Sequence, residues 1–160
     1  MIKRTTLITI APLLLAINVS CPAQQRDGTI QCSTEYEDSN QIDYGPLKIS
    51  AVRGTTLIQI GNKQQPDVPG ACFVLFTEKD HKVIANVRSS KDGRFEFQGI
   101  TPGQYRLVAR ADGLCTANVS LEVVKSSQKQ KTELLIHFIA VSLDTCSFAE
   151  LVRARPKGHT

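Results

Sequence analysis

Apolar and polar residues alternate along the middle of the chain, between residues 71 and 123. Successive side chains of a β-strand point to opposite faces, so an apolar residue at every second position predicts a strand with one buried face. The alternating apolar sets are Ala71, Phe73 and Leu75; Val83, Ala85 and Val87; Phe95 and Phe97; Tyr105, Leu107 and Ala109; and Ala117, Val119, Leu121 and Val123. The pattern therefore predicts a run of strands that share one apolar face.

Further strands are predicted on both sides of this region. Two precede it, over residues 47–52 ("LKISAV") and 55–60 ("TTLIQI"), and a strongly apolar one follows in "TELLIHFIAV", which starts at Thr132. Residues 125–131 ("KSSQKQK") contain no apolar residue and are expected to form a loop. Helical spacing of apolar residues is scarce, so crossover helices are not expected.

Glycine and proline mark the corners between the strands. Asp92-Gly93 is expected to form a tight hairpin between the strands near Val87 and Phe95, because glycine has no Cβ and adopts a positive φ without strain, and Asp112-Gly113 is expected to form a turn of the same kind. Pro102-Gly103 fits a type II turn, in which the glycine occupies the position that needs a positive φ. These turns, with strands between them, predict an all-β fold: an antiparallel β-sandwich of seven to eight strands.

Residues 1–23 have the layout of a secretory signal peptide. Two basic residues precede an apolar run over residues 7–19, and small residues follow up to Ala23. The run is too short to cross a membrane as a helix. Cleavage after Ala23 is the expected outcome, and lipidation of Cys21 in a lipobox-like sequence is the alternative. The mature protein is therefore expected to be secreted or periplasmic, without a transmembrane helix.

The rest of the chain divides into three parts. Residues 24–45 are polar and acidic and are expected to be largely irregular. Residues 46–142 hold the predicted strands and form the β-sandwich domain, and residues 143–160 follow as a C-terminal tail that carries a cysteine. Without the signal peptide the chain has 17 basic and 15 acidic residues. It lacks the concentrated basic stripe that nucleic-acid binding requires, so no nucleic-acid partner is expected.

Cysteine spacing supports export to an oxidising compartment. Four cysteines remain outside the signal region: Cys32, Cys72, Cys115 and Cys146. No C-x-x-C pair is present, so structural disulfides are expected rather than a zinc or redox site. Four cysteines allow three connectivities. Our preferred one joins Cys72 to Cys115 within the sandwich and Cys32 to Cys146 across the flanking segments.

Two motifs resemble a known family. "VPGACFVLF", from Val68, and "KDGRFEFQGITPGQYRLVARADGL", from Lys91, are similar to the carboxypeptidase regulatory-like domain. That domain is a transthyretin-like, or prealbumin-like, β-sandwich grouped with carbohydrate-binding-like folds, and the resemblance covers about residues 54–125. It implies a stand-alone secreted bacterial protein with an accessory role, because activity depends on sites added to a fold and not on the fold itself.

Related families that carry chemistry have motifs that this chain lacks. Neither His81 nor His137 opens the His-x-x-Glu pair of zinc carboxypeptidases. Pilin-like relatives cross-link a lysine to an asparagine with the help of an acid after the Tyr-x-Leu strand, where this chain has Ala109. Transthyretin-like hydroxyisourate hydrolases end in Tyr-Arg-Gly-Ser, whereas this chain ends in Gly-His-Thr. We therefore expect no catalytic residue, metal site or cofactor.

Binding candidates lie outside the predicted core. Tyr36 and Tyr44 are the aromatic side chains that remain for stacking on a sugar. Arg94, Arg106 and Arg110 are expected on one outer sheet face, where they would attract an anionic partner or pair with carboxylates across strands. We interpret the chain as a non-catalytic module that binds a glycan or an envelope protein. The alternative is a small secreted hydrolase or an enzyme accessory, which requires a concave pocket with convergent polar groups.

Overall fold

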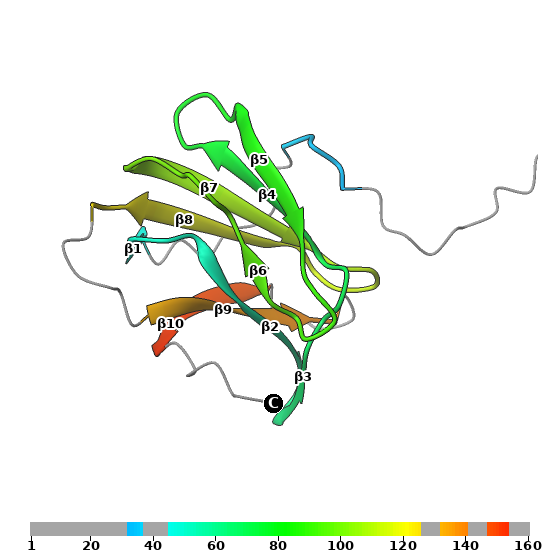
Figure 1. The fold of residues 1–160 in the computed structure, drawn as a ribbon. Helices are drawn as coiled ribbons and strands as arrows, with labels where there is room; N and C mark the ends of the chain where they lie inside the picture. The colour runs from blue at the N-terminus through cyan, green and yellow to red at the C-terminus, as the bar shows by residue number, and fades with distance from the viewer. Residues whose placement is uncertain (1–31, 37–44, 126–131, 141–146, 154–160) are drawn as a thin grey trace, which may run out of the picture.

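The computed structural model describes residues 32–36, 45–125, 132–140 and 147–153, and their strands form two sheets packed face to face (Figure 1). The strands are β1 (Leu47–Ile49), β2 (Arg53–Ile60), β3 (Lys63–Pro66), β4 (Cys72–Thr77), β5 (Val83–Arg88), β6 (Phe95–Glu96), β7 (Gly103–Arg110), β8 (Ala117–Val123), β9 (Thr132–Ile139) and β10 (Phe148–Arg153). Within these ranges no helix is long and apolar enough to cross a membrane.

Sheet A has the strand order β1-β8-β7-β4-β5, and sheet B has the order β10-β9-β2-β3, with β6 also paired to β2. Most neighbouring strands are antiparallel, but β1 runs parallel to β8 and β2 runs parallel to β9. The predicted all-β sandwich is confirmed, while both sheets are mixed and not purely antiparallel. Alternation along a strand reports which face is buried, and it carries no information about which distant strand lies alongside.

The alternating apolar residues meet between the two sheets. Sheet A contributes the buried side chains of Phe73, Leu107 and Leu121, and sheet B contributes those of Ile136 and Phe138, among others. The ring of Phe73 stacks on that of Phe95, which belongs to the β6 strand of the opposite layer, with centroids 4.0 Å apart and planes inclined by 13°. These contacts confirm the predicted apolar faces of β4, β6, β7 and β8.

Two strands lie where alternation did not predict them. All four residues of β3 are exposed, so this strand has no buried face to leave a pattern and is held by backbone pairing with β2. Strand β10 lies inside the segment expected as a tail, and it pairs along its whole length with β9. The sandwich therefore extends beyond residue 142 to Arg153.

A β-bulge turns one predicted core residue outward. The pairing of β4 with β5 shifts register between Leu75 and Phe76. Ala85 and Val87 therefore pack against the main core, whereas Val83 packs with Phe76 on the outer face of sheet A. An extra residue in one strand reverses the facing of those beyond it, and a strict period of two cannot anticipate this.

The corners follow the prediction in part. Gly93 and Gly113 adopt the expected positive φ values of 67° and 68°, and β7 and β8 pair across the Asp112-Gly113 turn. The hairpin predicted at Asp92-Gly93 is wrong, because β5 belongs to sheet A whereas β6 pairs with β2 of sheet B. The type II turn at Pro102-Gly103 is wrong, because Gly103 already belongs to β7, where it pairs with Val123. The positive φ of this connection, 71°, lies at Gly99.

Strands β2 and β9 approach so closely at Gly54 that a side chain has no space there. A Cβ atom on Gly54 would lie 2.0 Å from the carbonyl oxygen of Leu134 and 2.8 Å from its carbonyl carbon. Both are backbone atoms of the paired strand, so they cannot swing aside as a flexible side chain would. The parallel pair at the centre of sheet B therefore needs glycine at this position.

We predict that Gly54→Ala lowers the free energy of unfolding by about 3 kcal/mol or more, because it forces two paired strands apart. Urea unfolding followed by circular dichroism measures the loss. Gly113→Ala is the control, since its added Cβ meets nothing within 4 Å and the cost there is only that of a positive φ, about 1–2 kcal/mol. A smaller loss for Gly54→Ala than for Gly113→Ala would contradict the packing argument.

Candidate functional site

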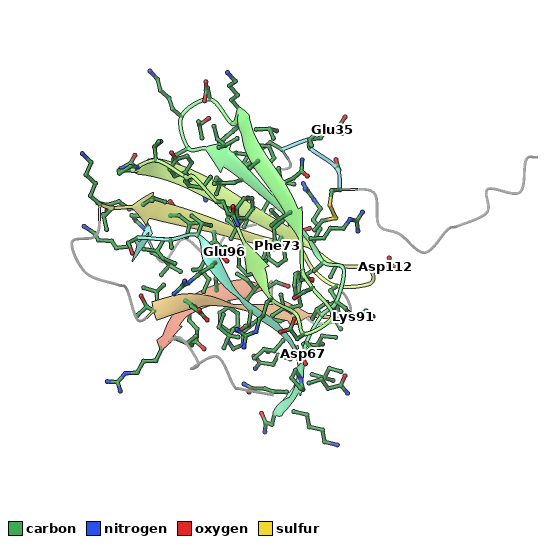
Figure 2. All side chains as sticks on the ribbon, in the orientation of Figure 1. Glu35, Asp67, Phe73, Lys91, Glu96 and Asp112 are labelled. Atoms are coloured by element: carbon green, nitrogen blue, oxygen red, sulfur yellow. A yellow bond between two sulfur atoms is a disulfide. The ribbon has the colours of Figure 1, made fainter. Side chains whose placement is uncertain are left out.

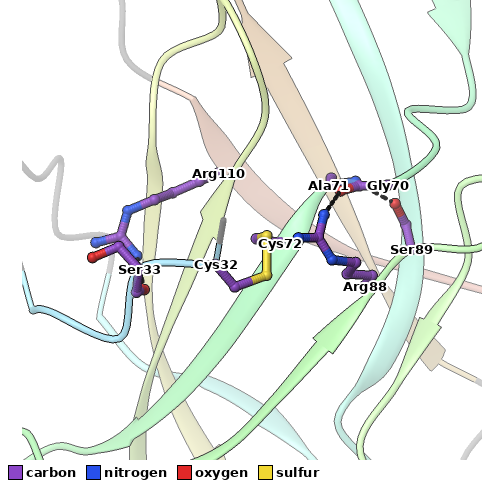
Figure 3. Close-up of a disulfide and its surroundings, with 8 residues drawn as sticks. All are labelled: Cys32, Ser33, Gly70, Ala71, Cys72, Arg88, Ser89 and Arg110. Carbon is purple, nitrogen blue, oxygen red and sulfur yellow. Dashed lines mark hydrogen bonds between the residues drawn. A yellow bond between two sulfur atoms is a disulfide. The ribbon is translucent and has the colours of Figure 1, made fainter. Parts of the chain in front are cut away.

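An N-terminal strap, residues 32–36, lies against the outer face of sheet A. Its Cys32 forms a disulfide with Cys72 of β4, and the two Cα atoms are 5.4 Å apart (Figure 3). Beside the disulfide, the Arg110 guanidinium donates from Nη1 to the Ser33 carbonyl (3.0 Å) and from Nη2 to the Glu35 carbonyl (2.9 Å). A covalent bond and a forked pair of hydrogen bonds thus hold the strap on the sheet.

Tyr36 closes the strap over a small apolar cluster. Its ring stacks on His81 with centroids 3.7 Å apart and meets the edge of Phe76 at 5.4 Å. Phe76 belongs to a buried cluster with Val74 and Val108 on the outer face of sheet A. Tyr36 is therefore engaged in packing rather than presented as a sugar-stacking platform. Tyr44, the other aromatic candidate, lies outside the described residues.

The three candidate arginines do not share one face. Arg106 and Arg110 lie on β7, and the Arg106 guanidinium forks onto Glu78, with Nε donating to Oε2 at 3.0 Å and Nη2 donating to Oε1. Arg94 instead precedes β6 and pairs with Asp92, its Nε 2.8 Å from Oδ2. The expectation of a common arginine face is wrong, because strand order sends these residues to different sheets.

The disulfide also differs from the preferred connectivity. Since Cys32 bonds Cys72, neither the Cys72–Cys115 pair nor the Cys32–Cys146 pair forms. Cys115 is a free thiol, and Cys146 lies outside the described residues. The direction of the Cys72 side chain explains this pairing. Cys72 lies between the core residues Ala71 and Phe73, so its side chain points to the outer face of sheet A, where the strap lies. Alternation in "ACFVLF" already carried that signal.

His137 is buried on the outer face of sheet B in a polar cluster. Its Nε2 lies 2.9 Å from Glu150 Oε1, and its Nδ1 lies 3.2 Å from Gln59 Oε1. The Phe148 ring stacks on the imidazole at 4.3 Å. His137 is thus a packed, hydrogen-bonded histidine. Across the described ranges, no three His, Cys, Asp or Glu side chains gather as they would to hold a metal ion.

A cleft of about 350 Å³ opens on the outer side of sheet B, between the end of β3 and the turn that precedes β6. Thr55 and Leu57 of β2 and Leu135 of β9 project from the outer face of the sheet into it. The remaining lining residues come from the centre of β2, from β3 and the residue after it, and from the turn: Thr56, Gln64, Pro66, Asp67, Asp92 and Arg94. Asp67, on the β3 side of the cleft, is labelled in Figure 2.

One buried hydroxyl joins both sides of this cleft. Thr56 Oγ1 accepts a hydrogen bond from the Val68 amide (2.8 Å) and donates one to the Gly93 carbonyl (3.2 Å). The Asp67 amide donates to the Thr56 carbonyl at 3.3 Å. A Cβ on Gly93 would lie 2.5 Å from that hydroxyl, so only glycine lets the turn approach so closely. The spacing of the two sides is therefore set by Thr56.

A second hydroxyl fixes the segment that carries Asp67. Ser89 Oγ donates to the Val68 carbonyl at 2.5 Å and accepts from the Ala71 amide at 2.9 Å. Asp67 itself adopts a φ of 65°, a region that few residues other than glycine and asparagine or aspartate enter. The Asp67 side of the cleft is thus held in one conformation before any ligand arrives.

The two carboxylates of the cleft differ in their partners. The pKa of Asp92 is lowered, chiefly because the Ser90 hydroxyl donates a hydrogen bond to it and further because Arg94 lies close by. The Asp67 carboxylate has no hydrogen-bond or ion-pair partner within the described part of the chain. Asp92 and Arg94 neutralise each other, so the uncompensated charge of the cleft is that of Asp67.

This arrangement suits binding better than catalysis. A general acid at neutral pH needs a raised pKa, whereas that of Asp92 is lowered. The hydroxyl of Thr56 is already engaged with two backbone groups, and no His, Cys or Lys is among the described residues that line the cleft. The cleft thus lacks the pair of nucleophile and adjacent base that covalent catalysis requires.

We predict that Cys32→Ser and Cys72→Ser each lower the free energy of unfolding by about 2–4 kcal/mol, because the bond closes a 40-residue separation in the unfolded chain. Thermal or urea unfolding measures the loss, and the double variant should lose no more than either single variant. Peptide mapping without reduction should yield a Cys32–Cys72 cross-linked peptide. A Cys72–Cys115 peptide would contradict the observed pairing.

We also predict that Thr56→Val destabilises the protein by about 1–3 kcal/mol, because a buried amide and a buried carbonyl lose their partner. Thr55→Val is the matched control: its hydroxyl makes no hydrogen bond to a described residue, so the change should stay within about 0.5 kcal/mol. Hydrogen exchange of the Val68 amide should accelerate in Thr56→Val alone. Equal stability of the two variants would show that the hydroxyl does not join the two sides.

Comparison with known proteins places this fold in a family. A family model described as SpaA, prealbumin-like fold domain, matches residues 53–134, from the start of β2 into β9. Neither the curated proteins nor the solved structures gave a match. The match confirms the expected prealbumin-like β-sandwich, and its range is close to the expected residues 54–125. Because it spans 82 of the 160 residues, the chain belongs to the SpaA prealbumin-like fold domain family.

Proposed function

We propose that this protein is a non-catalytic interaction module, secreted or periplasmic, which binds an envelope partner through the cleft on sheet B. Its family indicates a non-enzymatic module of structural or adhesion type. The Cys32–Cys72 disulfide indicates an extracellular or periplasmic location, because such bonds persist in oxidising compartments. The predicted signal peptide over residues 1–23, and lipidation of Cys21 as its alternative, lie outside the described residues and stay part of the proposal.

The observation that carries the proposal is the preformed cleft. Its volume of about 350 Å³ falls within the range of small ligand sites. The buried hydroxyls of Thr56 and Ser89 fix the two sides of the cleft, so little conformational entropy would be lost when a ligand binds. The other sequence candidates, Tyr36, Arg106 and Arg110, already make internal contacts. In the cleft, by contrast, the Asp67 carboxylate has no hydrogen-bond or ion-pair partner among the described residues.

The alternative function, a hydrolase or an enzyme accessory, requires a concave pocket with catalytic side chains. The cleft is a concave pocket, so its side chains decide whether hydrolysis is supported. A pair of carboxylates can hydrolyse a glycosidic bond when one of them is kept protonated as the acid. Asp92 is held in its ionised form by Ser90 and Arg94, so it is unsuited to be that acid, and its ion pair with Arg94 engages it as a nucleophile or base. The cleft therefore favours a binding role.

Of the two ligand classes expected from the sequence, an envelope protein fits better than a glycan. Sugar sites usually stack the ligand on an exposed aromatic ring. None of the described residues that line the cleft is aromatic, and Tyr36 of the strap is packed on Phe76 and His81. A protein partner needs no such platform, since it can insert a single side chain.

We predict that Leu135→Trp abolishes partner capture, because the larger side chain fills the cleft from its floor. The test immobilises the mature protein, passes envelope extract over it and identifies retained proteins by mass spectrometry, with a glycan array run in parallel. Ile84→Trp is the matched control, since Ile84 is 43% exposed on the edge strand β5 of the other sheet. It should capture the same protein as the native chain.

Two results would contradict the proposal. One is equal loss of capture in both tryptophan variants, which would place the contact elsewhere. The other is no retained protein and no glycan signal from the native chain. Turnover of ester, peptide or glycoside substrates that is lost in Leu135→Trp would support the hydrolase instead.

A further inference from the structure

We propose that the cleft on sheet B accepts an amphipathic cation: a primary ammonium or guanidinium group on a short aliphatic stem, as on a lysine or arginine side chain of a partner protein. This inference rests on the proposed function and names the chemistry of its ligand. Three independent features of the cleft lead to it: its charge, its apolar side chains and its fixed shape.

The charge of the cleft is negative after internal pairing. Arg94 lies 2.8 Å from Asp92, and these two groups cancel each other. Asp67 faces the same cleft and has no partner among the described side chains. An anionic ligand would compete with Asp92 for Arg94 and meet the charge of Asp67, whereas a cation gains the attraction of Asp67 and disturbs no existing pair. Complementary charge thus selects a cation.

Three apolar side chains form part of the cleft lining. They are those of Leu57, Pro66 and Leu135, which lie beside the polar groups. A lysine or arginine side chain has an aliphatic stem that packs on apolar surface and a charged end that stays in polar surroundings. In this cleft the stem would lie on the two leucines and the proline, and the charged end would reach Asp67. A compact inorganic cation would leave these apolar side chains unused, and the described residues offer it no cluster of ligands.

The position of Asp67 is fixed before binding. Its amide is bonded to the Thr56 carbonyl, and the next residue is bonded to the Thr56 hydroxyl. Only the side chain of Asp67 remains to be ordered, so even a surface ion pair adds measurable affinity. With a single uncompensated charge, we expect binding in the millimolar range for an isolated side-chain probe, strengthened within a protein interface.

The test titrates the ¹⁵N-labelled mature protein with four probes in parallel: n-butylammonium, N-acetyl-lysine amide, n-butanol and butyrate. We expect the two cations to shift amide signals of residues 55–57, 64–68 and 92–94, with much smaller effects from the neutral and anionic probes. Asp67→Asn should weaken cation binding about two- to fivefold, the range of an exposed ion pair. Raising the salt concentration should weaken it too, since salt screens exposed charges.

The control variant is Asp112→Asn, which removes an exposed aspartate from a different turn and should leave the affinity unchanged. Asparagine tolerates the positive φ of residue 67, so Asp67→Asn keeps the backbone, and its unfolding transition checks this. Equal binding of butanol or butyrate, or unchanged affinity in Asp67→Asn, would overturn the inference. Binding of butylammonium without N-acetyl-lysine amide would overturn the protein side chain as the source.

The outcome separates the inference from the function on which it rests. If no cation binds while Leu135→Trp still abolishes capture of a partner, the cleft is an interaction site and the cation is wrong. If neither capture nor cation binding is seen, both fail together.

Discussion

The close parallel pairing of β2 with β9 is the contact on which the rest of the structure depends. It brings Leu134 against Gly54, with no space for a Cβ, and so joins segments about 80 residues apart in the chain. The same pairing sets Leu135 beside Thr55 and builds the floor of the cleft. Strands β10, β3 and β6 all attach to this pair, so sheet B and its cleft exist only because β2 and β9 meet.

Hydrogen bonds of buried polar groups then fix the connections and the strap that cover the outer faces of the two sheets. A hydroxyl or amide removed from water must find a partner, and Thr56 and Ser89 find theirs in backbone groups of the connections beside the cleft. On the opposite sheet, Arg110 finds its partners in the carbonyls of the strap. These bonds hold a disulfide-linked strap on the outer face of sheet A and fix the two sides of the cleft on sheet B, so the two outer faces differ in structure.

Several side chains that could bind a ligand or take part in catalysis are already bonded to other residues of the fold. Arg106 is forked onto Glu78, His137 lies between Gln59 and Glu150, and Tyr36 is stacked on His81. The candidate side chains found in the sequence therefore stabilise the fold through these contacts. What remains is the cleft lined by Asp67 and by Leu57, Pro66 and Leu135, which is the binding surface that we propose.

The sequence by itself determined the class of the fold and much of its core, because alternation is a local property: Phe73, Phe95 and Leu107 lie buried where it placed them. Exposed β3, the bulge beside Val83 and the Cys32–Cys72 bond were decided by the tertiary structure. So was the cleft, since its lining comes from residues between 55 and 135 that share no local pattern. Which residues become neighbours depends on strand order, and strand order follows from burial summed over both sheets and not from any single stretch of chain.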